Sequence, residues 1–519
     1  LVRRPGRNDP AFTPTAGPSD PPYVPAYRPP RRMPIYFPVP PLTPPVRPFA
    51  IAPAVRLNEV FAGLSYALDL TEGQRPGHSV RSTLIGMKLA EVIGLPADER
   101  ESLFHALLLK DLGCSSNSAR FAAIFGNDDH ELKATLATIN WSNALQSFRF
   151  VARSVAPGHF WMTRVWRILG VLARGPEGAR EVVRTRCERG ADIARLLNLS
   201  EATVQAIRTI DEHWDGKGQP YDMAGEDIPF LGRIVGLSQT FEVFLSTAGV
   251  SAAYDMAQIR RGRWFDPALV DALRSVQRDT AFWNNLASGR EWDALSHIPH
   301  GVSDRQATND QLDQVAEAFA RVIDAKSPWT YKHSNGVADI SVAIAQRLGF
   351  REQDVRAVRQ GALLHDLGKL GVSSLILDKP GKLDQREFQA MRQHPAHTAA
   401  ILSRVSCFAP LATFAAAHHE KLDGSGYHRG LPAHMLPLEA RILCVADICD
   451  ALRASRPYRE GLPTERVLDI MGREVGTALD PDCFKALADV LQHGHSADAA
   501  ETPAAHLVTA LAEDYEQAA

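Results

Sequence analysis

The sequence has no apolar run that could span a membrane and no paired cysteines. Its most apolar stretch, residues 399–417, is interrupted by Arg404 and Pro410, whereas a membrane helix needs about 20 consecutive apolar residues. The six cysteines are scattered and none forms a CxxC pair, which excludes a disulfide scaffold and a cysteine-based zinc site. We therefore expect a protein without a membrane span, located in a reducing cytoplasm.

The chain also lacks a strong net charge. Its 519 residues carry a formal net charge of −3, so no global field attracts a nucleic-acid polymer or an anionic membrane, although a local basic patch remains compatible with this value. With 45% hydrophobic and 23% charged residues, the composition is that of a globular protein. The length predicts at least two domains.

The N-terminal segment has too little apolar surface for a core. The first 50 residues contain 16 of the 35 prolines and seven arginines, against two aspartates. Proline interrupts helices and sheets, and the remaining residues show no helical periodicity. We predict a disordered or polyproline-like tail over residues 1–53.

Alternation with a period of two is nearly absent from the rest of the chain, so little of it favours β-strands. Apolar residues instead recur at spacings of three and four, which is typical of amphipathic helices. The clearest examples are residues 82–93, 101–109, 337–348 and 355–364. The predicted fold class is all-α.

Four segments of the first half recur in the second half. Residues 77–79 and 109–113 resemble segments 255 residues later, and residues 215–218 and 232–234 resemble segments 208 residues later. The two offsets differ by 47, which predicts an insertion of about that length in the first copy, near residues 117–162. We therefore predict two tandem helical-bundle domains. The predicted boundaries are 54–285 for the first domain, 286–309 for a linker, 310–495 for the second domain and 496–519 for a C-terminal tail.

The second copy concentrates imidazole and carboxylate groups within apolar helical segments. These are His333, His365, Asp366, His394, His418, His419 and Asp447. Burying such groups unpaired costs roughly several kcal/mol each, and metal coordination would offset that cost. Imidazole with carboxylate suits iron, manganese, zinc or nickel, and the two oxygens of Asp366 can bridge two metals. A single histidine on a helix is more often a core or surface residue, but the adjacent His-Asp and His-His pairs favour a joint metal site.

The second copy resembles the HD-GYP domain, the metal-dependent phosphodiesterase branch of the HD superfamily. The motifs that carry the resemblance include Leu364-His-Asp-Leu-Gly-Lys, Lys379-Pro-Gly-Lys, His418-His-Glu-Lys-Leu-Asp-Gly-Ser-Gly-Tyr and Arg441-Ile-Leu-Cys-Val-Ala-Asp. The resemblance implies an α-helical fold, two divalent metal ions, and hydrolysis of the bacterial second messenger cyclic di-GMP. Iron or manganese are the metals expected first, with zinc, nickel or magnesium as alternatives.

Matching positions assign the ligands that the resemblance implies. One metal would be held by His333, His365, Asp366 and Asp447, and Asp366 would bridge to a second metal held by His394, His418 and His419. A bridging water would then become a hydroxide nucleophile that attacks the phosphorus. Asp366 and Lys369 are therefore the expected catalytic residues, with the Lys369 ammonium directed at a phosphate oxygen.

Further positions are candidates for substrate binding. Beside Lys369, the loop with Gly426 and Tyr427 offers backbone N–H groups and an aromatic face. Arg456 and Arg459 are candidates for phosphate or guanine contacts, with helix-capping salt bridges as an equal alternative.

The sequence departs from the family pattern at two places. The family's Gly-Tyr-Pro reads Gly426-Tyr427-His428 here, which bears on the hypothesis that a protein partner binds this loop. Trp329 stands where members with a third metal carry Glu, so two metals are expected.

The first copy keeps two of the seven predicted ligands, His78 and Asp111. The remaining positions carry Lys110, approximately Arg186, Ile210, Asp211 and Gln239, and Cys114 replaces Lys369. We expect a catalytically inactive domain that packs against the second copy as a scaffold, in preference to a nucleotide sensor. His78 and Asp111 either bind an ion weakly or are satisfied by Lys110 and Arg186.

Three functions remain open for the whole chain. The leading hypothesis is a cyclic di-GMP phosphodiesterase, and a second keeps the metals but changes the substrate to cyclic GMP-AMP or another signalling nucleotide. The third is a catalytically slow, nucleotide-responsive interaction module. The complete ligand set of the second copy favours an enzyme.

Overall fold

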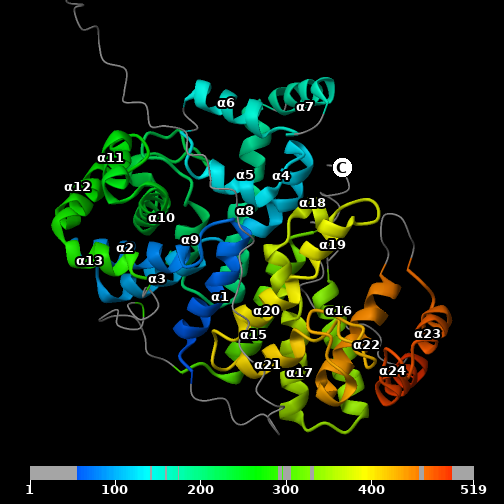
Figure 1. Ribbon diagram of the computed structural model, residues 1–519. Coiled ribbons are helices and arrows are strands. Elements are labelled where there is room, and N and C mark those ends of the chain that lie inside the picture. The colour runs from blue at the N-terminus through cyan, green and yellow to red at the C-terminus, as the bar shows by residue number, and fades with distance from the viewer. Residues whose placement is uncertain are drawn as a thin grey trace, which may run out of the picture. The chain divides into compact units, whose positions relative to one another are not determined.

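The protein is described by a computed structural model over residues 55–140, 143–157, 160–173, 175–289, 295, 306–327, 332–454 and 461–493. Within these ranges the regular elements are helices (Figure 1), and strand-like pairing is confined to isolated bridges. The predicted all-α class is confirmed. None of the helices in these ranges combines the length and apolarity needed to cross a membrane. The predicted tails at 1–53 and 496–519, most of the linker, and Trp329, Arg456 and Arg459 lie outside the described residues.

The first copy begins with three helices that pack on one another. The helices of this copy that flank the insertion are α1 (Leu57–Thr71), α2 (His78–Val92), α3 (Ala97–Leu109), α8 (Gly175–Leu196), α9 (Glu201–Arg208), α10 (Phe230–Ala248), α11 (Val250–Arg260), α12 (Pro267–Ser275) and α13 (Thr280–Ala287). Between Gly113 and α8 lie η1 (Cys114–Asn117), α4 (Ser118–Phe125), α5 (Asp129–Leu136), α6 (Ala144–Ser154) and α7 (Trp161–Ala173). The helical segment near the predicted insertion thus extends beyond residue 162 to the end of α7.

The second copy repeats the order of α1–α3 and α8–α12, and α6, α7 and α13 have no counterpart among its described helices. Its elements are α15 (Asn309–Asp324), α16 (His333–Arg347), α17 (Glu352–Leu364), η5 (Leu367–Gly371), α18 (Ser374–Leu377), α19 (Gln385–Met391), α20 (His394–Leu402), α21 (Ala409–Ala415), α22 (Leu438–Arg453), α23 (Thr464–Gly472) and α24 (Pro481–His493). The domain boundaries drawn from the sequence stay a prediction.

Equivalent residues hold the two copies in the same local geometry. Asp69 accepts hydrogen bonds from the backbone and hydroxyl of Ser79, and Asp324 does the same for Ser334. Each carboxylate therefore fixes the first turn of the helix that carries the first histidine of its copy. The positions are 255 residues apart, as the sequence repeat requires.

The two copies share one hydrophobic core rather than forming separate cores. Buried residues from α1, α3 and α10 of the first copy join those of α15, α17 and α22 in a continuous cluster. Helix α1 lies between the copies. The Arg404 guanidinium of the second copy packs over the Tyr66 ring of α1, 4.1 Å from the ring centroid. The predicted packing of the two domains against each other is therefore extensive and apolar.

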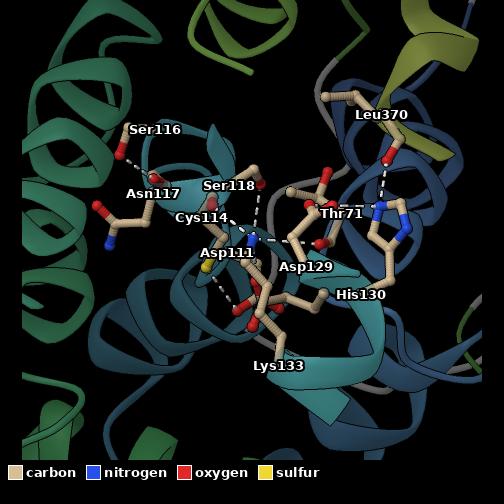
Figure 2. A network of polar contacts seen from close by, with 12 residues as sticks. Thr71, Asp111, Cys114, Ser116, Asn117, Ser118, Asp129, His130, Lys133 and Leu370 are labelled. Carbon is tan, nitrogen blue, oxygen red and sulfur yellow. Dashed lines mark hydrogen bonds and ion pairs between the residues drawn. The ribbon is translucent and has the colours of Figure 1, made fainter. Parts of the chain in front are cut away.

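A buried polar cluster on α5 ties the insertion to the second copy. Lys326 Nζ lies 2.6 Å from Asp129 Oδ2, and the backbone N–H of Ser374 donates to Asp129 Oδ1 at 2.8 Å. Figure 2 shows His130 facing the Leu370 carbonyl, where Nε2 and oxygen are 3.0 Å apart. Lys133, on the same helix, donates to backbone carbonyls and a hydroxyl of the first copy. Helix α5 is thus bonded to both copies.

Replacing Lys326 with methionine should destabilise the protein strongly. Lys326 and Asp129 are 1% and 0% exposed at their side chains, so Lys326→Met leaves a buried carboxylate without its cation, a change that costs about 3–5 kcal/mol. We expect that decrease in the free energy of unfolding from denaturant titration. The control Lys88→Met removes surface ion pairs with Glu91 and Asp279 and should cost less than about 1 kcal/mol. Equal effects of the two substitutions would contradict the role given to the buried pair.

Candidate metal centre

Seven side chains predicted to be metal ligands meet at one place in the second copy. His333 is the first residue of α16, His365 and Asp366 follow α17, His394 begins α20, His418 and His419 follow α21, and Asp447 lies within α22. Five of the seven are at least nine-tenths buried by residue, whereas His333 and His419 are partly accessible at their side chains. Helix ends and helix-following turns therefore supply most of the site.

Asp366 lies at the centre of this group. Its Oδ1 is 3.4 Å from His394 Nε2 and 3.7 Å from His418 Nε2, whereas its Oδ2 is 3.3 Å from His365 Nε2 and 3.7 Å from His333 Nε2. The two oxygens therefore face two different sets of histidines. This is the arrangement that a carboxylate bridging two cations requires.

Two sets of three donors are close enough to hold one cation each. Donor atoms of His394, His418 and His419 lie within 4.8 Å of one another, and so do those of His333, His365 and Asp447. These are the two ligand sets that the sequence resemblance implies, with Asp366 between them.

The histidine tautomers leave nitrogen lone pairs pointing into the site. His365, His394 and His418 each direct Nδ1 to the carbonyl oxygen three residues earlier, at 2.6–2.8 Å. A carbonyl can only accept, so Nδ1 carries the hydrogen and Nε2 of the neutral ring is a free acceptor. Burial holds the pKa of His394 and of His418 well below the usual value, which keeps both rings neutral.

The facing acceptor atoms of this group are arranged to bind a cation. His394 Nε2 and His418 Nε2 are 3.2 Å apart, and with both hydrogens on Nδ1 two lone pairs face each other. His365 Nε2 and Asp366 Oδ1 are buried without a hydrogen-bond partner. Buried polar groups are normally satisfied, and a metal ion fits this set of acceptors.

His333 is oriented by two carboxylates. Its Nδ1 is 2.7 Å from Asp450 Oδ2 and its Nε2 is 3.3 Å from Asp447 Oδ1. Burial opposes the charge, but these hydrogen bonds outweigh it and raise the pKa of His333 to about 10. A metal ion at this position therefore competes with a proton. Burial also opposes ionisation of Asp447, yet the hydrogen bond from His333 lowers the pKa of its carboxyl.

Asp450 was not among the residues predicted from the sequence. It orients His333 as a carboxylate often orients a ligating histidine. Two signals were available: Asp450 follows Asp447 by three residues on α22, one turn along the same face, and Glu242 stands 208 residues earlier in the first copy.

The accessible side of the site carries Lys369, His419 and Tyr427. Lys369 forms an ion pair with Asp366 Oδ2 and is partly exposed. The Tyr427 ring lies 4.7 Å from the His419 ring, centroid to centroid. The Arg392 guanidinium lies 4.9 Å from the centroid of the Tyr427 ring. Burial raises the pKa of the Tyr427 hydroxyl, which therefore stays protonated. Arg392 was not predicted as a site residue from the sequence.

In the first copy the equivalent positions are occupied by ion pairs. Lys110 pairs with Asp111 and Arg186 pairs with Asp211, while His78 pairs with Glu242. Burial opposes the charges, but the ammonium of Lys110 keeps the pKa of the Asp111 carboxyl below its usual value. The expectation that Lys110 satisfies Asp111 agrees with these contacts, although His78 is satisfied by Glu242 rather than by Arg186. His78, Asp111, Arg186, Asp211 and Gln239 line a cavity of about 730 Å³.

The chain is similar to known proteins over both copies. A family model described as HD domain matches residues 177–269 and 317–483. The 3'3'-cGAMP-specific phosphodiesterase 3 of Vibrio cholerae is 41% identical over 435 residues, which cover 84% of this chain and 94% of that protein. The cyclic di-GMP phosphodiesterase response regulator RpfG of Xanthomonas campestris is 38% identical over 196 residues, 37% of this chain and 52% of that protein. A crystal structure of a cyclic GMP-AMP specific phosphodiesterase of V. cholerae has a TM-score of 0.58 at 36% identity, covering 84% of this chain and 98% of that chain.

Adding a methyl group at Gly368 should abolish metal binding. A Cβ on Gly368 would overlap the carbonyl oxygen of His394, so Gly368→Ala must push His394 away from its partners. Gly113→Ala is a matched control, because a Cβ there would overlap the carbonyl oxygen of Arg186 in the first copy. Metal content of the folded fraction, measured by elemental analysis, should fall only for Gly368→Ala. Equal metal content in both variants would contradict the placement of His394 at the metal.

Removing the charge of Asp450 should weaken metal binding without removing a ligand. Asp450→Asn loses the carboxylate that orients His333, and losses of about 10–100-fold in metal affinity follow from such changes. The control Glu242→Gln removes the equivalent carboxylate of the first copy. A metal titration followed by calorimetry should show the loss for Asp450→Asn and unchanged affinity for Glu242→Gln.

Proposed function

We propose that the substrate of this chain, which belongs to the HD domain family, is 3'3'-cyclic GMP-AMP. The chain is a cyclic dinucleotide phosphodiesterase of the HD-GYP type. The Vibrio cholerae protein that is 41% identical over 84% of the chain, and therefore over both copies, is named for that substrate. The similarity to a cyclic di-GMP phosphodiesterase covers 37% of the chain, too little to include both copies. The sequence-based expectation of cyclic di-GMP therefore holds for the class of substrate, and cyclic di-GMP itself is the second candidate.

We propose further that His333, His365, Asp366, His394, His418, His419 and Asp447 hold two divalent metal ions, iron or manganese before zinc, nickel or magnesium. The observation that carries this proposal is the set of inward-facing Nε2 atoms around Asp366. Bound metal would supply Lewis acidity at the phosphoryl oxygen and lower the pKa of the attacking water. The second copy alone is assigned this role, since Lys110 and Arg186 occupy the equivalent space in the first.

The residues of the chain position the phosphodiester and balance its charge. Asp366 fixes the centre through both carboxylate oxygens, and Lys369 places an ammonium at its accessible side, where it stabilises negative charge that grows on the phosphate in the transition state. The Nδ1 hydrogen bonds of His365, His394 and His418 keep the rings from rotating. The donor set is thus preorganised by backbone carbonyls, at no cost when substrate binds.

Tyr427 is proposed to stack on a base of the substrate. A Cβ on Gly426 would lie 2.5 Å from the Cα of Glu420, so glycine lets the loop close and brings Tyr427 over His419. Arg392 beside the ring adds a positive charge for a guanine carbonyl or a phosphate. Because the Tyr427 ring is turned toward His419, its placement supports a role in substrate binding more than the contact with a protein partner considered from the sequence. Arg456 and Arg459 remain proposed phosphate or guanine contacts.

We also propose a cytoplasmic location. All six cysteines are buried and free, which agrees with a reducing compartment.

Hydrolysis by the purified full chain tests the proposed function. We expect protein prepared anaerobically with ferrous iron or manganese to hydrolyse 3'3'-cyclic GMP-AMP with a higher kcat/KM than cyclic di-GMP. The double variant His365→Ala, Asp366→Ala should lose more than roughly 100-fold in kcat/KM. A loss of that size is the upper range for removing a residue that only supports a metal ligand.

The matched control is Lys110→Ala, Asp111→Ala, which removes the equivalent pair from the first copy. It should keep its kcat once the thermal midpoint shows a folded protein. Faster hydrolysis of cyclic di-GMP would reverse the substrate proposal. Bound metal without hydrolysis of either nucleotide would favour the slow interaction module over the enzyme.

A further inference from the structure

Helices α6 and α7 expose a group of large apolar side chains. Fifteen large apolar side chains are exposed in the described part of the chain, and eight of them belong to α6, α7 and the residue before α7. These eight, here called the α6–α7 surface, are Leu145, Phe148, Phe160, Trp161, Met162, Val165, Trp166 and Leu169. The two tryptophans are 65% and 75% exposed. Figure 1 shows α6 and α7 side by side at the top of the view.

The α6–α7 surface is not needed to hold its own helices in place. On α7, residues 161, 162, 165, 166 and 169 share one face by helical spacing. The adjoining face carries Ile168 and Val171, which pack with Phe125 and Phe150 in a small core of the insertion. The helices are anchored from behind, and the outward face has a different use. Apolar groups of this extent on a surface usually mark an interaction site.

The same segment is strongly basic in a chain whose net charge is negative. Residues 143–173 contain four arginines and no lysine, aspartate or glutamate. Arg149 and Arg153 on α6 are exposed, and neither forms an ion pair with the described residues. An apolar face rimmed by unpaired arginines is complementary to a partner that has a negatively charged outer layer over an apolar interior.

We propose that the α6–α7 surface docks the protein on an anionic lipid bilayer. Tryptophan prefers the boundary between acyl chains and headgroups, and arginines beside an apolar helical face bind anionic headgroups. The charge argues against two other occupants. A second copy of the chain would set arginines against arginines in a two-fold contact, and the N-terminal segment, with seven arginines among its first 50 residues, is also basic.

The proposal concerns attachment and leaves the catalytic site as described. The proposed metal ligands come from the second copy, and none of them belongs to the insertion. Docking would therefore place cyclic dinucleotide hydrolysis at a membrane surface without changing the chemistry. It extends the expectation drawn from the net charge, which left room for a local basic patch.

Sedimentation with lipid vesicles tests the proposal on the full chain. The probes are vesicles of phosphatidylcholine alone and vesicles that also contain phosphatidylglycerol. We expect binding to the anionic vesicles at least about tenfold stronger than to the neutral ones, weakened by salt because exposed charges are screened. The variant Trp161→Ser, Trp166→Ser should lose about tenfold in binding and keep its rate of hydrolysis. The control Ile259→Ser, Leu438→Ser removes exposed apolar residues elsewhere and should bind as the unchanged protein does.

Three results would overturn the proposal. The first is equal binding to both kinds of vesicle. The second is absence of binding to either. The third is a change in oligomeric state of the tryptophan variant, seen by analytical ultracentrifugation, without a change in lipid binding, which would assign the surface to a second copy.

Discussion

The burial of the Asp366 carboxylate among imidazole rings is the constraint on which the second copy depends. A charged group taken out of water must be compensated nearby, and here the rings of His365, His394 and His418 offer lone pairs, while Lys369 pairs with one carboxylate oxygen. The first copy meets the same constraint differently. Asp111 stands at the equivalent position, and Lys110 with Arg186 supplies positive charge from the chain itself. One helical frame thus supports two solutions: in the first copy the chain supplies the positive charge, whereas the second copy presents donor atoms that fit a metal ion.

The frame tolerates both solutions because its own contacts do not involve the ligands. Gly113 and Gly368 let the turn after the third helix of each copy approach α8 and α20, respectively, and Asp69 and Asp324 hold the starts of α2 and α16. Loss of ligands in the first copy therefore leaves its fold intact. The shared core and the Lys326–Asp129 pair next to η5 support the scaffold hypothesis for this copy. Its cavity of about 730 Å³ is the observation that favours the sensor alternative.

Sequence reasoning reached the fold class, the repeat and the group of seven side chains, because helical periodicity and motif spacing are local properties. It did not reach Asp450, Arg392 or the pair between Lys326 and Asp129, which are 197 residues apart. Such contacts depend on how helices approach one another, and no local pattern encodes that approach. The substrate was open for a similar reason: metal ligands determine the reaction, whereas the base is selected by side chains such as Tyr427 that the loops bring to the site.

The insertion is where the first copy differs most from the second, so any property specific to the first copy should reside there. Two features separate along it. Helix α5 turns inward, and its Asp129 and His130 contact Ser374 and the Leu370 carbonyl, one residue beyond Lys369. Helices α6 and α7 turn outward and carry tryptophans and unpaired arginines that the fold does not use. Helix α5 contacts η5, the turn that carries Lys369, whereas α6 and α7 are exposed. The insertion therefore links the surface of the protein to the candidate metal centre through direct contacts.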